Sequence, residues 1–84
     1  MPYDRIRHSK HVVIGTNQTI RLLLDAKIAE VFLAKDADER ITSSIMQLCQ
    51  EHNVSFEWIA TMKMLGKACG IQVGAAVAAI KKNP

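Results

Sequence analysis

The sequence predicts an α/β protein: a three-layer α/β/α sandwich in which helices cover both faces of a small mixed four-stranded sheet. Three observations support this prediction. Short apolar runs alternate with segments of helical periodicity along the 84 residues. One run, residues 28–35, has three large apolar residues in succession, as expected of a strand covered on both faces. The chain is 49% hydrophobic and 23% charged, which suits one compact core, so residues 1–84 are expected to form a single domain.

The first half of the chain begins with room for a brief helix containing Ile6 and continues with a predicted strand and helix. An apolar run at residues 11–14 stops at Gly15, Thr16 and Asn17, which are good turn and N-cap residues for the helix that follows. At about 100° per residue this helix has an apolar arc beside a polar arc that starts at its N-terminus. The apolar arc contains Ile20, Leu23 and Leu24, and the polar arc contains Asn17, Gln18, Arg21 and Asp25.

After the strand at residues 28–35, the chain continues with a second long helix and a third strand. Residues 36–39 are mainly acidic and suit the N-cap and first turn of a helix, which stops at the polar residues 52–53. Residues 54–59 alternate in polarity, which indicates a strand. The helix is expected to bury Ile41, Ile45, Leu48 and Cys49.

The last part of the chain predicts a short helix and a final strand. Thr61 can cap the helix, which carries Met62, Leu65 and Cys69 and ends near Gly70. The run at residues 75–80 is rich in Ala, yet the preceding glycine and the β-branched residues within it favour a strand.

Composition narrows the classes of function. The net charge of +3 and the pI of about 9.1 favour a polyanionic partner, whereas the aromatic content of 5% argues against a platform for stacking bases. No run of 18 apolar residues occurs, and the first residues are too polar for a signal peptide, so we expect a cytoplasmic protein without membrane contact. Cys49 and Cys69 lack the spacing of a zinc site and are expected to be buried thiols. No metal or other cofactor is expected, and His8, His11 and His52 are expected at the surface.

The segment 15–21 is the first candidate site, because a strand delivers the chain into a helix there. Unpaired amides and the positive end of the helix dipole attract phosphate at such a junction. Side chains three or four residues apart converge, so Asn17, Gln18 and Arg21 can form one patch that suits base edges and phosphates. The alternative is that Thr16 or Asn17 only caps the helix and that Arg21 is a solvated charge.

The segment 65–76 is the second candidate. Ile71 and Val73 fall in a loop between glycines, where apolar side chains are either buried in the core or offered to a partner. Lys67 beside this loop can contact a phosphate, although a single lysine is commonly just solvated.

Both segments resemble one family. Residues 15–21, Gly-Thr-Asn-Gln-Thr-Ile-Arg, resemble the Gly-Ala-Asn-Glu-x-x-Lys signature of the kink-turn-binding ribosomal protein superfamily, which contains the archaeal L7Ae and L30e proteins. Residues 65–76 are similar to that family's Leu-Gly-(Lys/Arg)-Ala-x-Gly-Ile-x-Val-x-Ala tract. The resemblance covers nearly the whole chain, and residues 14–16 and 34–38 are most similar to the short bacterial YbxF-type members.

The resemblance implies a monomeric, non-enzymatic protein that binds RNA kink-turns, with the ribosome as one place of action. In a kink-turn a three-nucleotide bulge adjoins tandem sheared G·A pairs, and the kink exposes base edges that regular A-form RNA hides. Gln18 stands where the family usually has Glu, and Arg21 where it usually has Lys. Gln18 retains an acceptor with one less negative charge, and Arg21 retains the cation. The implied RNA-binding residues are Gly15, Thr16, Asn17, Gln18, Arg21, Lys67, Ile71, Gln72, Val73, Gly74 and Ala75.

Two other classes of function remain as alternatives. An enzyme is disfavoured because the sequence shows no nucleophile with a base at motif spacing, no carboxylate pair and no phosphate-cradling Gly-rich loop. A protein-interaction module would use the apolar loop 71–75 to meet a protein instead of RNA.

Overall fold

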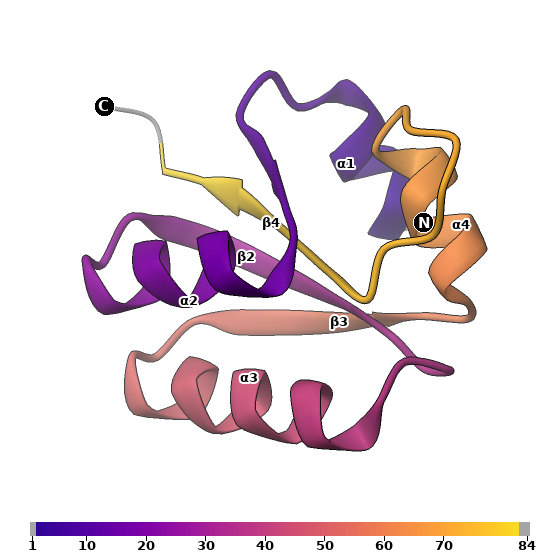
Figure 1. Ribbon diagram of the computed structural model, residues 1–84. Coiled ribbons are helices and arrows are strands. Elements are labelled where there is room, and N and C mark those ends of the chain that lie inside the picture. The colour runs from indigo at the N-terminus through magenta and orange to yellow at the C-terminus, as the bar shows by residue number, and fades with distance from the viewer. Residues whose placement is uncertain (1, 83–84) are drawn as a thin grey trace.

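A computed structural model of the chain describes residues 2–82 and has the predicted alternation of helices and strands (Figure 1). Each predicted element is present, with its ends shifted by one or two residues. In chain order the elements are α1 (Pro2–His8), β1 (Val12–Ile14), α2 (Thr16–Leu24), β2 (Ile28–Ala34), α3 (Glu39–Glu51), β3 (Ser55–Ile59), α4 (Met62–Ala68) and β4 (Val77–Lys81).

The sheet is mixed and four-stranded, as predicted, with the strand order β1-β4-β2-β3. Strands β2 and β3 are parallel, whereas β4 is antiparallel to both of its neighbours, β1 and β2. The pairing of β1 with β4 sets Ile14 opposite Ala78. This pairing brings together two parts of the chain that are more than sixty residues apart.

Helices cover both faces of the sheet, which confirms the three-layer α/β/α prediction. Helices α1 and α4 lie on one face and α2 and α3 on the other (Figure 1). Because side chains alternate along a strand, β2 buries Phe32 and Ala34 toward the first face and Val31 and Leu33 toward the second. The α1/α4 core includes Ile6, Leu65, Ala68 and Ala78, and the α2/α3 core includes Leu23, Ile45, Cys49, Val77 and Ala79.

The N-cap of α2 is one of the three predicted residues, but the predicted side-chain cap is missing. The N-cap is Gly15, whose φ of 109° is accessible to glycine and strained for other residues, and no side chain caps the helix. Thr16 is the first helical residue instead. Thr19 is fully buried, and its Oγ1 donates a hydrogen bond of 2.8 Å to the Gly15 carbonyl oxygen. Sequence reasoning was wrong to place a side-chain cap at Thr16 or Asn17, because the buried hydroxyl one turn later holds this turn.

Two other details were wrong. Leu24, placed on the apolar arc, is 59% exposed: it is the last residue of α2 and lies about 100° around the helix from the fully buried Leu23. Ladder pairing of the last strand begins at Val77, so the predicted strand residues Ala75 and Ala76 complete the loop instead.

The caps of α3 and α4 follow the prediction. The Asp38 carboxylate accepts from the Arg40 N–H at 2.9 Å, and the Thr61 hydroxyl accepts from the Met64 N–H at 3.0 Å. Asp36 has a role that sequence reasoning missed: its Oδ1 accepts from the Met62 N–H at 2.7 Å and so ties the end of β2 to the start of α4. Cys49 is buried and Cys69 half-buried, and burial raises the pKa of both thiols. All three histidines are exposed, as predicted.

Candidate nucleic-acid interface

The two candidate segments meet at one edge of the sheet. The Gly15 N–H donates to the Val77 carbonyl oxygen at 3.0 Å, so the entry to α2 adjoins the point where the second segment enters β4. The Ala34 N–H donates to the Ala76 carbonyl oxygen at 3.0 Å and fixes the same point from β2. In Figure 1 the end of the α4–β4 loop descends to the start of β4, on the side where β1 leads into α2. One ligand that spans this edge can therefore touch both segments.

The polar patch at the start of α2 faces solvent. Asn17, Gln18 and Arg21 are exposed, and among residues 2–82 none of their side chains has a hydrogen-bond or ion-pair partner. The first amides of a helix also lack intrahelical acceptors. Donors, acceptors and a cation are thus available together, next to the Gly15 turn and the half-buried Thr16.

The loop between α4 and β4 is held tightly against α4. The Ile71 N–H donates to the Gly66 carbonyl oxygen at 3.1 Å, and the Ala75 N–H donates to the Met62 carbonyl oxygen at 3.0 Å. Gly66 permits a close approach, since a Cβ atom there would overlap the Val73 carbonyl oxygen. The loop backbone is therefore fixed at its beginning, middle and end.

The apolar residues of this loop have two different fates. Ile71 is half-buried and packs against the α1/α4 core, and Ala75 is buried, whereas Val73 is 70% exposed. Gln72 and Gly74 are exposed beside Val73. Both sequence readings thus hold in part: the ends of the loop are anchored in the core, and its tip offers one large apolar side chain to solvent.

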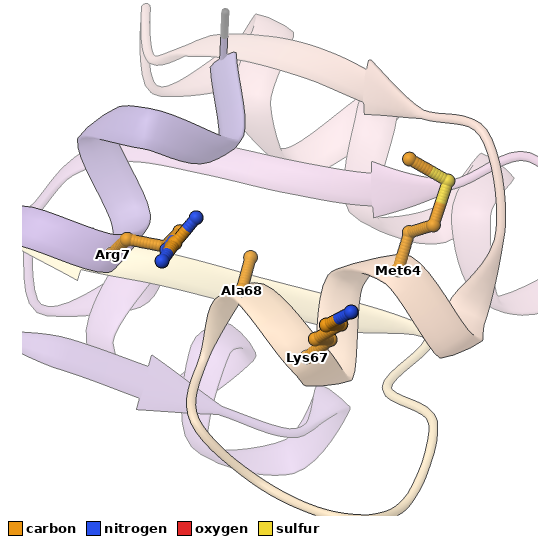
Figure 2. A pocket seen from close by; sticks show the side chains of 4 residues that line it. All are labelled: Arg7, Met64, Lys67 and Ala68. Atoms are coloured by element: carbon orange, nitrogen blue, oxygen red, sulfur yellow. The ribbon is translucent and has the colours of Figure 1, made fainter.

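Lys67 is exposed on α4 and lines an open hollow of about 380 Å³. The other lining residues are Met64 and Ala68 of α4 and Arg7 of α1 (Figure 2). Arg7 was missed at the sequence level, although a signal was present: residues 5–24 and residues 58–82 contain cations and no Asp or Glu. These acid-free stretches contain every predicted site residue.

The part of the chain that the structure describes has no helix with the length and apolar character needed to cross a membrane. Within the same residues, no three His, Cys, Asp or Glu side chains are grouped as metal ligands.

Comparison with known proteins places the chain in a family. The sequence profile of the ribosomal protein L7Ae/L30e/S12e/Gadd45 family matches residues 3–84. An RNA-binding protein of Geobacillus thermodenitrificans is 49% identical over 80 residues, which cover 95% of this chain and 98% of the relative. The RNA-binding protein YbxF of Geobacillus stearothermophilus is 45% identical over 80 residues, with the same coverage of both chains.

Solved structures agree with the sequence comparison. The 15.5kD RNA binding protein of Giardia lamblia superimposes with a TM-score of 0.91 at 26% identity, over 98% of this chain and 72% of that one. The resemblance seen in the two motifs thus extends to the whole sequence and to the fold. The chain belongs to the ribosomal protein L7Ae/L30e/S12e/Gadd45 family, among its short bacterial YbxF-type members.

Proposed function

We propose that the protein binds structured RNA at kink-turns, through the edge where α2 begins and the α4–β4 loop ends. The observation that carries this proposal is the hydrogen bond from Gly15 to Val77, which joins the start of α2 to the point where the α4–β4 loop enters β4. The names of the relatives, which are RNA-binding proteins, support the RNA part of the proposal.

The chemistry of the patch suits the kinked region of such an RNA. Asn17 and Gln18 each offer a donor and an acceptor to the guanine edges of the G·A pairs. Arg21 can bind a guanine edge or a phosphate with two parallel hydrogen bonds. The amides of the Gly15–Thr16 turn, at the positive end of α2, would meet a neighbouring phosphate.

The loop tip suits the bulged nucleotides. Val73 would cover unstacked bases with its exposed side chain, and the polar Gln72 and small Gly74 beside it leave room for them. Ile71 and Ala75 would anchor the loop to the protein core, and Lys67 would place its cation near the phosphates of the RNA backbone. Recognition would combine RNA shape with a few base contacts.

In this proposal the protein is a monomeric RNA-binding domain of the cytoplasm and not an enzyme. Its work is to hold a kinked RNA conformation, as in ribosomal or other structured RNAs. Stabilising one conformation needs only tighter binding to that conformation than to its alternatives.

The deciding experiment measures affinity for a kink-turn hairpin and for the same duplex with its G·A pairs replaced by Watson–Crick pairs. We expect clear preference for the kink-turn. In Asn17→Ala, loss of base-edge contacts of about 1–3 kcal/mol would weaken kink-turn binding from severalfold to about a hundredfold. Gln50→Ala, an exposed amide near the far end of α3, is the matched control and should bind as wild type. Equal wild-type affinity for the two RNAs would refute kink-turn recognition.

The exposure of Val73 favours a second candidate, in which the loop tip docks on a protein. Apolar docking changes little with ionic strength, whereas contacts of Arg21 and Lys67 with phosphate weaken steeply as salt rises. A partner whose binding is abolished by Val73→Asp and insensitive to salt would support this role.

A further inference from the structure

We propose that the groove between α1 and α4 is a second RNA-binding surface, which takes the phosphodiester backbone of the helical stem next to the kink. This inference rests on the proposed function and extends its footprint to Arg7 and Lys10. Neither residue belongs to the two motifs.

Charge is unevenly distributed along the chain. Residues 5–24 and 58–82 contain eight Lys and Arg residues and no carboxylate side chain, whereas residues 25–57 contain seven of the eight acids. The acid-free stretches contain the second half of α1, after Asp4, and all of β1, α2, α4 and β4, whereas the acidic stretch contains α3. A polyanion that approaches the predicted edge therefore meets a favourable potential along α1 and α4 and an unfavourable one along α3.

The groove itself is a pair of adjoining hollows. The hollow of Figure 2, flanked by Arg7 and Lys67, has Met64 and Ala68 on its α4 side. A second open hollow of about 420 Å³ shares Arg7, Lys67 and Ala68 and adds Lys10. The described residues that line the two hollows include no Asp or Glu. The three cations thus come from two helices and the segment after α1, and they border one continuous depression.

These cations are free to bind a ligand. Arg5, on the same helix, is already engaged: its guanidinium donates to Glu30 at 2.6 Å and to Glu57 at 3.3 Å and lies 5.9 Å from the centre of the Phe32 ring. Arg7, Lys10 and Lys67 have no ion-pair partner among residues 2–82. Helix α1 therefore uses one arginine to attach itself to the sheet and presents the other to the groove.

Continuity with the proposed site identifies the occupant. Lys67 belongs both to the groove and to the predicted RNA-binding residues, and Gly70, where the α4–β4 loop begins, lines the second hollow. The hollows are open, and the lining residues that the structure describes include no aromatic or amide side chain that could read a base. Cations with neither base-reading nor stacking partners are typical of contacts to phosphate.

The test compares the groove variant Arg7→Gln/Lys10→Gln with the control variant Lys27→Gln/Lys81→Gln. The control also removes two positive charges, but from another part of the surface. Lys27 follows α2, and Lys81 alternates with Ile80 and so faces the α2/α3 layer. Binding to a kink-turn with long stems is measured over a range of salt concentrations. Each phosphate contact contributes roughly 0.7–0.9 to the slope of log affinity against log salt.

We expect the groove variant to lose about 1–2 units of slope relative to the control variant, since it lacks up to two phosphate contacts. Its preference for the kink-turn over the Watson–Crick duplex should be retained. Arg7→Lys/Lys10→Arg keeps the charges and should restore the slope, which separates loss of charge from loss of folding. Trimming the stems should lower the wild-type slope and leave the groove variant nearly unchanged.

Two results would overturn the proposal that the groove binds RNA. One is an equal salt slope for the groove and control variants, and the other is a salt slope that Arg7→Lys/Lys10→Arg fails to restore. Failure of the proposed function has a different signature, because it is read from wild-type protein alone as equal affinity for the two RNAs. The two hypotheses can therefore fail independently.

Discussion

Replacing Gly66 by alanine should move the α4–β4 loop while leaving the rest of the fold in place. A Cβ atom at this position would overlap the Val73 carbonyl oxygen and would lie 3.0 Å from the Val73 carbonyl carbon and 3.2 Å from the Gly74 Cα. All three are backbone atoms, so no side-chain rotation can relieve the overlap. Because residues 72–74 are exposed, the loop can yield more easily than the helix.

Two opposing energies set the size of the effect. Alanine is favoured over glycine inside a helix by about 1 kcal/mol. Overpacking a tight contact costs about 1–3 kcal/mol. We therefore expect Gly66→Ala to lower the free energy of unfolding by at most about 2 kcal/mol, with full helical content. Displacement of the loop tip should also weaken binding, by at least about 1.4 kcal/mol or tenfold in affinity for the kink-turn.

Urea unfolding, circular dichroism and RNA titration measure these quantities directly. Val73→Ala is the matched variant, because it removes the exposed side chain without moving the backbone, and it should lose less affinity than Gly66→Ala. Hydrogen exchange of the Ala75 amide, which donates to Met62, reports whether the loop has left α4. Wild-type affinity in a Gly66→Ala protein whose Ala75 amide has lost protection would refute the idea that the seated loop contributes to binding.

Three further predictions concern the contacts that support the site. Thr19→Val removes the buried hydroxyl that donates to Gly15, so urea unfolding should show a loss of about 1 kcal/mol and RNA titration a weaker complex; wild-type behaviour in both would contradict this. Asp36→Ala should lower the free energy of unfolding by about 1 kcal/mol, because the Met62 N–H loses its acceptor. Asp25 is an exposed carboxylate just after α2, and Asp25→Ala should leave the stability unchanged. Burial raises the pKa of the Cys49 thiol from 9.0 to about 11, so the neutral thiol is favoured in the fold. The free energy of unfolding should be independent of this thiol below pH 9. Between pH 9 and pH 11 it should fall by up to about 1.4 kcal/mol per pH unit, because the thiol ionises in the unfolded chain and stays neutral in the folded one. Cys49→Ala should show a smaller fall, and an equal one would contradict the prediction.

Periodicity predicted the layers well because burial on both faces leaves a pattern in the sequence. Residues 31–33 are continuously apolar since β2 has a helix layer on each side. The cap of α2 could not be predicted in the same way. Gly15 and Thr19 act through a backbone angle and a buried hydroxyl, and a threonine inside a helix is not by itself a sign of either. Leu24 was misplaced because periodicity gives a broad apolar arc and does not show which part of that arc meets the sheet.

The candidate site was predicted in part. Each motif could be recognised locally, but their adjacency depends on the pairing of β1 with β4, which no local pattern contains. The separate fates of Ile71 and Val73 depend on how the loop folds back over Gly66, a tertiary contact. Arg7 was missed because a single exposed arginine has no distinguishing neighbours in sequence. It becomes notable only when α4 brings Lys67 to the other side of the hollow.

The position of β4 links ligand binding to folding. This strand is made after the other three yet lies between β1 and β2, so the sheet stays open until β4 inserts. Loop-closure entropy must be lost before that insertion yields any contact energy, which makes it a late and cooperative event. A partly folded chain is therefore not expected to have only one of the two site segments in place. RNA that binds the complete site would stabilise the folded chain against unfolding.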